Sequence, residues 1–212
     1  MSGASPVRLM LVTDAGRLSG RSQVEIVSAA IAGGVTRLQV RERSMPGGPL
    51  LRLVEEILAA AKGRAAAKVA LHVNDRLDIA LAAGASGVHL PAAGLPVKLV
   101  RQKTGARFRI GRSVHSVAEA RAAQKEGADE VIFGPIFATP EKAVFGPPQG
   151  IDALRKVLDA VRLPVWAIGG ITPATAVELK GLPIAGVAAI GAFATADDPA
   201  RAARDLLAAL SG

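Results

Sequence analysis

Charged and amide side chains end one of the short apolar runs in this sequence, and they are the first candidates for chemistry. The run Leu38–Val40 leads into Arg41, Glu42 and Arg43. Alternation along a strand places Gln39, Arg41 and Arg43 on one side. A guanidinium fork matches phosphate or carboxylate oxygens, and burying it without an anion is costly. We expect these three side chains to bind an anionic ligand. The alternative is that Arg41 pairs with Glu42 or another acid of the protein.

A second polar end follows the next apolar run, where Asn74 and Asp75 come directly after Leu71–Val73. A carboxylate together with substrate phosphates is the usual way in which proteins hold Mg²⁺. Asp75 is therefore a candidate metal ligand, and Asn74 a candidate ligand-binding side chain. Asn and Asp are also favoured as helix N-caps, and the sequence leaves both interpretations open.

Glycines follow the last two apolar runs of the chain. Gly169 and Gly170 come after Val165–Ile168, and Gly191 comes after Ile190. Backbone N–H groups at such turns can approach a phosphate closely, and the last two strand ends of a barrel are a recurrent phosphate site. We expect these glycines, with Ile190, to bind a phosphate.

A long loop rich in proline and glycine extends from Gly134 to Pro148 and carries Thr139 and Lys142. A loop of this kind suits a cover over a substrate. Lys142 would supply a flexible positive charge there, although an ordinary solvated lysine is the alternative.

The elements that must position these residues alternate strictly between strand-like and helix-like patterns, which indicates βα units and a parallel sheet. The predicted strands are Leu9–Thr13, Thr36–Arg41, Val69–Asn74, Gly87–Leu90, Phe108–Gly111, Glu130–Gly134, Val165–Gly169 and Gly186–Ile190. The predicted helices are Ser22–Ala32, Pro49–Ala61, Arg76–Ala83, Leu95–Lys103, Ser116–Glu126, Ile151–Val161, Pro173–Lys180 and Pro199–Leu210.

Eight strands and eight helices in this order predict an α/β fold, a single (β/α)8 TIM barrel over residues 1–212 with a flexible N-terminus at 1–7. A doubly wound open sheet is the alternative. It usually carries a glycine-rich turn after its first strand, and Thr13–Gly16 has no such motif.

Composition narrows the function classes. The chain has 212 residues, no cysteine and three histidines, so disulfides and multi-histidine zinc sites are not expected. The net charge is +8, but aromatic residues make up only 3% and the basic residues are scattered, which argues against nucleic-acid binding. No apolar run is long enough to span a bilayer or to serve as a signal peptide. We expect a cytoplasmic protein without membrane partners.

Taken together, the motifs resemble the thiamine-phosphate synthase/TenI family along nearly the whole chain. The matching segments are Leu9–Asp14, Gln39–Arg43, Val73–Arg76, Gly87–Leu90, Gly134–Phe137, Thr139 with Lys142, and Ile168–Gly170. The synthase joins a pyrimidine pyrophosphate to a thiazole phosphate, and Mg²⁺ neutralises the departing pyrophosphate.

The resemblance implies roles for individual residues. Carried over by position, the side chains that would hold the pyrimidine pyrophosphate are Gln39, Arg41, Asn74 and Lys142. Asp75 would be one Mg²⁺ ligand. The residues that would hold the thiazole phosphate are Gly169, Gly170 and Gly191.

Two positions depart from the synthase pattern. Gly94 stands where synthases carry the aspartate that is the second magnesium ligand, and Glu141 stands where a threonine is expected. Both changes weaken the binding of metal and pyrophosphate, because the ion loses a ligand and the anion gains a like charge.

Three stretches look instead like the TenI branch: Arg41–Ser44, Leu90–Pro91 and Gly111–Ser116, the last with Ser113 and His115. This branch is associated with aromatising a thiazole carboxylate phosphate by proton transfer, which needs an acid/base and no pyrophosphate. Its expected histidine is Pro135 here, so His115 is the substitute candidate. The alternative is that His115 only caps or packs.

We therefore expect first a TenI-like thiazole tautomerase without a cofactor, with Lys142 and His115 as catalytic candidates. A Mg²⁺-dependent thiamine-phosphate synthase is the alternative, and a non-catalytic phosphate-binding regulator is the third. The expected partner is a thiazole phosphate, with a pyrimidine pyrophosphate as a second substrate of the synthase. The sequence leaves a homodimer open.

Overall fold

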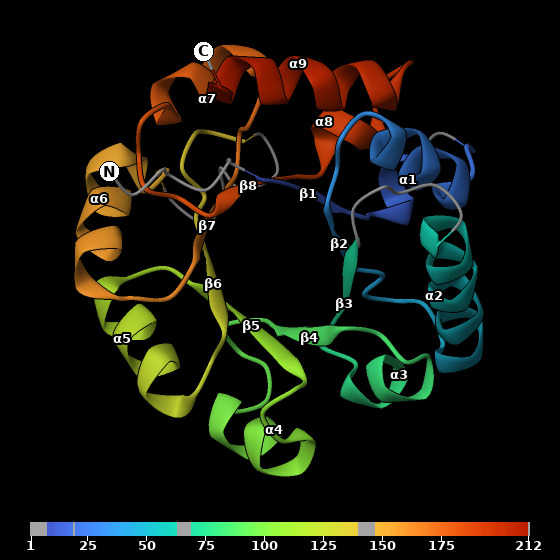
Figure 1. Cartoon of the computed structure of the whole chain (residues 1–212), viewed down its shortest axis with the longest axis horizontal. Coiled ribbons are helices and arrows are strands. Elements are labelled where there is room, and N and C mark those ends of the chain that lie inside the picture. The colour runs from blue at the N-terminus through green and yellow to red at the C-terminus, as the bar shows by residue number, and fades with distance from the viewer. Residues whose placement is uncertain (1–7, 19, 63–68, 140–146, 212) are drawn as a thin grey trace.

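Eight parallel strands close into a barrel in the computed structural model, which describes residues 8–18, 20–62, 69–139 and 147–211 (Figure 1). Each strand pairs with the next, and β1 pairs with β8, with Met10 opposite Ala188. The predicted barrel is confirmed, because in an open doubly wound sheet β1 and β8 would not pair with each other. The N-terminus expected to be flexible, 1–7, lies outside the described residues.

The strands follow the sequence prediction closely. They are β1 (Arg8–Val12), β2 (Arg37–Val40), β3 (Ala70–Asn74), β4 (Gly87–Leu90), β5 (Arg109–Val114), β6 (Glu130–Phe133), β7 (Val165–Ile168) and β8 (Gly186–Ala189). The largest difference is β5, which was predicted to end at Gly111. It continues to Val114 because Ser113 pairs with Ile132 and Val114 pairs with Phe133 of β6.

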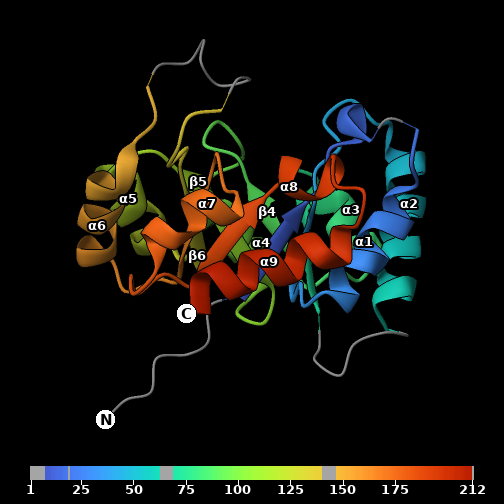
Figure 2. The same cartoon turned by 90° about the horizontal axis from the view of Figure 1, so that it is seen from above.

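Helices surround the strands on the outside (Figure 2). They are α1 (Gln23–Ala32), α2 (Gly47–Lys62), α3 (Leu77–Ala82), α4 (Val97–Thr104), α5 (Val117–Glu126), α6 (Gly150–Ala160), α7 (Pro173–Ala176), α8 (Gly191–Ala194) and α9 (Pro199–Ser211), with the 3-10 turns η1 (Ala15–Arg17) and η3 (Val177–Leu179). The short helix α8 was not predicted. The helix predicted over Pro173–Lys180 divides into α7 and η3. No described helix combines the length and apolarity that crossing a bilayer requires.

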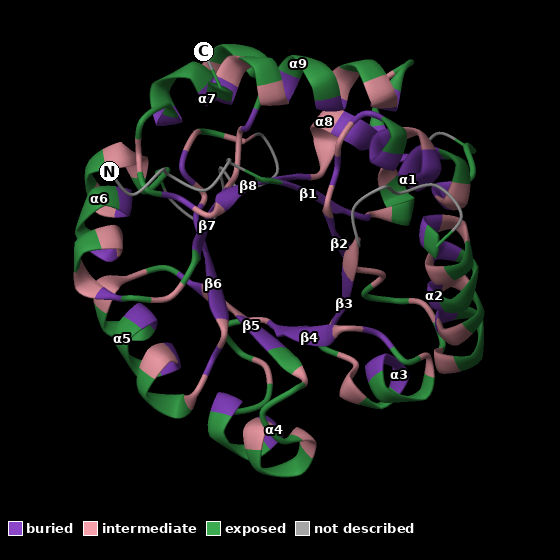
Figure 3. Cartoon of the chain, viewed as in Figure 1, coloured by how far each residue is buried: buried purple, intermediate pink, exposed green. Residues whose placement is uncertain are grey.

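The main core lies between the strands and the helices. The outward-facing side chains of the strands, such as Leu9, Leu38 and Val88, are fully buried and form one cluster with apolar side chains of the helices. The buried stretches of the helices lie on their sides towards the barrel (Figure 3). The helices begin at ordinary caps; for example, the Ser22 hydroxyl accepts a hydrogen bond from Glu25 N and starts α1. This layer holds the strand ends rigidly in place.

The barrel interior divides into an apolar part and a polar part. A small apolar cluster fills the side formed by β6, β7, β8 and β1, and its buried members are Met10, Val12, Ile132, Trp166 and Ala188. The polar side chains buried elsewhere in the interior include Arg37, Gln39, His72, His89 and Glu130. Barrel interiors are usually filled by branched apolar residues, so this polar part is unusual.

An ion pair organises the floor of the interior. Arg37 Nη2 donates to Glu130 Oε2 at 2.8 Å, and Trp166 Nε1 donates to the same oxygen at 3.2 Å. His72 Nε2 lies 3.4 Å from Arg37 Nη1, and its Nδ1 lies 3.4 Å from Glu130 Oε1. Burial lowers the pKa of Arg37, against the opposing effect of Glu130, and lowers that of His72 well below 6.5. Removing Arg37 or Glu130 would leave the other as an unpaired buried charge, so these two residues act as a unit.

Candidate active site at the carboxyl ends of the strands

Two arginines share one carboxylate where β1 and β2 end. Arg41 Nη1 lies 3.4 Å from Asp14 Oδ2, and Arg17 Nε lies 3.6 Å from the same oxygen. Burial is the largest cause that lowers the pKa of Arg41, followed by the charge of Arg43, while Asp14 raises it. A guanidinium fork such as that of Arg41 is also suited to bind an anionic ligand. Arg43 itself is exposed.

Glu42 is not the partner of Arg41, although the sequence left that pairing open. Its Oε1 accepts hydrogen bonds from Thr13 Oγ1 and from Gln23 Nε2, each at 2.6 Å, and its Oε2 accepts from Ala15 N at 2.9 Å. Glu42 therefore fixes the loop between β1 and α1. That loop carries the carboxylate which holds Arg41.

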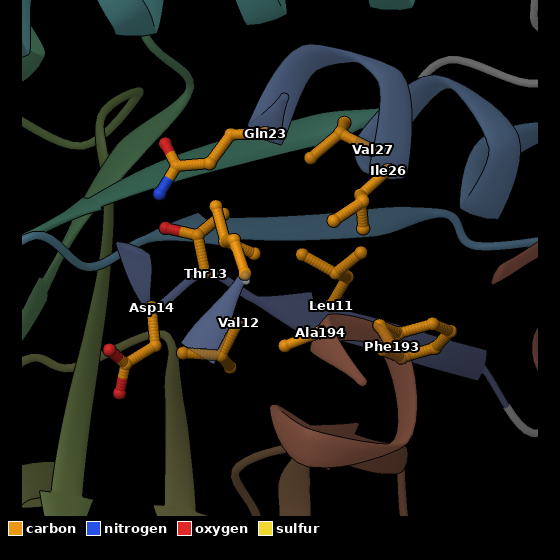
Figure 4. A pocket seen from close by; sticks show the side chains of 10 residues that line it. Leu11, Val12, Thr13, Asp14, Gln23, Ile26, Val27, Phe193 and Ala194 are labelled. Carbon is orange, nitrogen blue, oxygen red and sulfur yellow. The ribbon is translucent and has the colours of Figure 1, made fainter. Parts of the chain in front are cut away.

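A small pocket lies beside this loop, between β1, α1 and α8 (Figure 4). Its walls are mainly apolar, with Leu11, Ile26 and Phe193 among them, and Thr13 and Asp14 also line it. The space is about 10 Å³. A single water needs at least about this volume, so the pocket is too small for a substrate.

The amides predicted to bind ligand lie together. Gln39 Nε2 donates to Asn74 Oδ1 at 3.1 Å, which joins the ends of β2 and β3. Asp75 follows directly and is exposed, with a left-handed φ of 63° that few residues other than glycine adopt. Its N–H donates to His89 O at 2.8 Å. The carboxylate is thus presented at the barrel mouth.

The metal-binding role expected of Asp75 can be tested against its surroundings. A Cβ on Gly94 would lie 2.9 Å from Asp75 Oδ1, so position 94 faces this carboxylate but supplies no ligand. No group of three or more histidine, aspartate or glutamate side chains that could hold a metal occurs among the described residues. This site fits a Mg²⁺ ion that brings most of its ligands as substrate phosphates and waters.

Ser113 is held by a residue that the sequence analysis did not single out. Its Oγ lies 2.7 Å from His89 Nε2, and His89 is 2% exposed. Burial is the largest cause that lowers the pKa of His89 to about 3, and the charges of Arg112 and Arg41 lower it further. Alternation in Gly87–Leu90 places His89 on the face opposite Val88 and Leu90, which could have identified it.

His115, the substitute proton carrier, has a structural bond. Its Nδ1 lies 2.7 Å from Gly134 O, and its backbone N–H donates to Glu119 Oε2 at 2.8 Å. A carbonyl oxygen only accepts, so Nδ1 carries the proton of this contact. The side chain links the end of β5 to the loop after β6, where Pro135 lies. Its role in proton transfer remains a prediction.

The glycines expected to bind phosphate have different structural requirements. Gly169 and Gly170 have φ of 102° and 66°, and a Cβ on them would lie 2.5 Å from Pro135 Cβ and 2.6 Å from Phe137 Cβ. Both are required by the fold itself. Gly191 begins α8 after Ile190, and a Cβ there would have an ordinary contact of 3.6 Å with Arg17 Nη1. Arg17 therefore lies next to the proposed phosphate site.

The remaining predicted residues belong to the long loop. Thr139 Oγ1 is buried and has no hydrogen-bond partner among the described residues. Lys142 and Glu141 lie outside the described residues, so their predicted roles stay predictions.

Comparison with known proteins decides the family. The family model described as thiamine monophosphate synthase matches residues 9–193 of this chain. The chain belongs to that family. A thiamine-phosphate synthase of Chloroflexus aurantiacus is 41% identical over 204 residues, which are 96% of this chain and 93% of the relative. A thiamine-phosphate synthase of Anaeromyxobacter dehalogenans is 43% identical over 192 residues, which are 91% of this chain and 85% of the relative.

The solved structures agree with this family. A thiamine phosphate pyrophosphorylase from Pyrococcus furiosus has a TM-score of 0.86 and 31% identity, and the match covers 97% of this chain and 98% of that one. The resemblance to the synthase/TenI family is thereby confirmed. The names of these relatives favour the synthase, our alternative, over the TenI-like tautomerase that we expected first.

Proposed function

We propose that this member of the family is a thiamine-phosphate synthase, which joins a hydroxymethylpyrimidine pyrophosphate to a thiazole phosphate. The bond between the pyrimidine methylene carbon and a pyrophosphate oxygen breaks, and that carbon bonds to the thiazole nitrogen. Pyrophosphate is the leaving group. Relatives named as synthases at 41% and 43% identity support this function.

The observation that supports the proposal is that Arg41 and Gly191, each a candidate to bind an anion, both follow barrel strands at their carboxyl ends. Arg41, next to Asp14, would bind the pyrophosphate on one side, with Gln39 and Asn74 placing the pyrimidine. On the other side, the backbone at Gly191 would bind the thiazole phosphate near Arg17. A reaction between two phosphorylated substrates requires two such sites.

Mg²⁺, when bound, would neutralise the charge of the departing pyrophosphate. Asp75 would be its protein ligand, and pyrophosphate oxygens and waters would supply its other ligands. Because Gly94 contributes no carboxylate, we expect the metal to bind together with the pyrophosphate rather than to the free protein.

The tautomerase is the second candidate, because the missing carboxylate at position 94 would not matter to a reaction without pyrophosphate. Purified protein should be supplied with both synthase substrates, with and without Mg²⁺, and separately with the thiazole carboxylate phosphate. Metal-dependent formation of thiamine phosphate is expected. Metal-independent aromatisation without thiamine phosphate would overturn the proposal in favour of the tautomerase, and turnover of neither would leave a phosphate-binding regulator.

A further inference from the structure

His89 connects the mouth of the barrel to its interior. One ring nitrogen, Nε2, is 2.7 Å from Ser113 Oγ at the mouth. The other, Nδ1, is buried and has no hydrogen-bond partner among the described residues. A buried polar atom without a partner is uncommon in a native protein, and an ordered water is one usual explanation.

A second buried atom without a partner faces the same place. Glu130 Oε1 makes no hydrogen bond within the described part of the chain. A Cβ built on Gly111 would lie 2.8 Å from His89 Nδ1 and 3.6 Å from Glu130 Oε1. The two atoms therefore flank the position where residue 111 has no side chain. One of them can donate a proton, and the other, a carboxylate oxygen, only accepts.

Hydrogen-bond donors surround the carboxylate of Glu130. Its other oxygen accepts from Arg37 at 2.8 Å and from Trp166 at 3.2 Å. Arg37 can only donate, so His72 Nε2 accepts from it and His72 carries its proton on Nδ1, facing Glu130 Oε1 at 3.4 Å. That contact is not a hydrogen bond, because Glu130 Oε1 has no hydrogen-bond partner among the described residues. Glu130 Oε1 thus remains an acceptor without a hydrogen-bond donor among the described residues, and it lies near Gly111 of β5.

We infer that a buried water over Gly111 bridges His89 Nδ1 and Glu130 Oε1, and that it holds His89 in the Nδ1–H form. In this form Nε2 is an acceptor, and the Ser113 hydroxyl donates its hydrogen bond to it. A chain of hydrogen bonds then runs from the Ser113 hydroxyl at the mouth, through the His89 ring and the water, to the Glu130 carboxylate at the floor of the barrel. Each hydrogen bond in such a chain polarises the next.

The consequence concerns what Ser113 can recognise. With its own proton committed to His89, Ser113 Oγ offers only lone pairs to a ligand, so it selects an N–H or O–H donor. His89 is then a positioning residue that acts through Ser113. This step rests on the proposed function, because Ser113 is one of its proposed substrate-binding residues, whereas the state of His89 can be measured without any substrate.

The test uses ¹⁵N-histidine-labelled protein at pH 7 without ligand. The chain has three histidines, so the ring nitrogens give few signals, and a His89→Gln variant assigns those of His89. The neutral Nδ1–H pattern is expected for His89. Burial lowers its pKa to about 3, so the ring is neutral at this pH. An Nε2–H pattern would overturn the inference.

Gly111→Ala and Gly111→Ser form a matched pair. Both place a Cβ at the same 2.8 Å contact with His89 Nδ1, so the steric disturbance is shared. Alanine displaces the water without replacing its hydrogen bonds, whereas the serine hydroxyl can replace them. The Nδ1–H signal should shift or be lost in Gly111→Ala and be retained in Gly111→Ser. Equal spectra for the two variants would contradict the bridge.

Two further measurements keep the test decisive. If neither variant folds, a high-resolution crystal structure of the unmodified chain should contain the water between His89 Nδ1 and Glu130 Oε1, and its absence there would overturn the inference. In the synthase assay, Gly111→Ala should raise KM for the ligand that faces Ser113 by roughly fivefold to tenfold more than Gly111→Ser does, the effect of about one hydrogen bond. An unmodified protein without synthase activity would refute the proposed function, while the spectra would still decide this inference.

Discussion

Lowering the pH from 7 to 5 should destabilise this barrel, because the unfolded chain then binds protons on histidines that the fold keeps neutral. The pKa of His89 is lowered from 6.5 to about 3, chiefly by burial. Below pH 6.5 the unfolded chain therefore binds a proton that the folded chain does not. The contribution of His89 is fully present above about pH 6.5 and is lost as the pH falls towards about 3.

The loss in the free energy of unfolding follows from the difference between the pH and the pKa of histidine in the unfolded chain. At pH 5 the group is about 1.5 pH units below its unfolded pKa, and each unit corresponds to about 1.4 kcal/mol, which gives a loss of about 2 kcal/mol. His72 adds a loss in the same direction, because burial lowers its pKa well below 6.5. Most carboxylates remain ionised at pH 5, so this interval isolates the histidines.

The assay is urea unfolding followed by circular dichroism at half-unit steps between pH 7.5 and 5, with the free energy of unfolding plotted against pH. His89→Gln and His72→Gln each remove one titrating group, so each variant should show a shallower acid slope than the unmodified chain. A free energy that stays constant between pH 7 and 5 in the unmodified chain would refute the reasoning, and so would unchanged slopes in both variants.

Three other changes address the mouth. Arg41→Met should lower the free energy of unfolding by less than about 1 kcal/mol, because the pair with Asp14 is long and partly exposed, but should weaken pyrophosphate binding by about 2–5 kcal/mol in calorimetry. A large loss of stability with unchanged binding would make Arg41 structural. Gly191→Leu should keep the melting temperature and reduce thiazole phosphate affinity at least about tenfold, because the added side chain would block charge-assisted hydrogen bonds to the phosphate; equal affinity would remove Gly191 from the site. Gly94→Asp places a second carboxylate beside Asp75 and should give the free protein measurable Mg²⁺ binding, where the unmodified chain binds the ion poorly. Submillimolar Mg²⁺ binding by the unmodified chain would contradict that assignment.

The sequence predicted the fold well because strand and helix periodicity alternate without interruption. Its errors lie at strand ends. β5 was predicted to end at Gly111 because Arg112 and Ser113 interrupt the apolar run, yet both pair with β6 and extend the strand. The helix α8 was missed because Gly191–Ala194 is too short to show a period.

Side chains of the candidate site could be predicted where the pattern of their own strand identifies them. Contacts between residues far apart in the sequence could not be predicted. Gln39 and Asn74 were expected at the mouth and are joined there by a hydrogen bond. The partner of Arg41 is Asp14, which lies on another strand end, and nothing in the local pattern favours it over Glu42. The pair of Arg37 and Glu130 joins residues far apart in the chain, and only the closure of the barrel brings them together.

The floor of the barrel also contains a built-in optical probe. Trp166 is the single tryptophan of the chain, and the guanidinium carbons of Arg8 and Arg37 lie over its ring at 5.4 Å and 5.5 Å from the centroid. Its ring is fully buried, and its N–H donates to Glu130. The indole emission of the unmodified protein therefore senses the charges and hydration of the floor. Fluorescence can follow the arrival of solvent at this end of the barrel without a label.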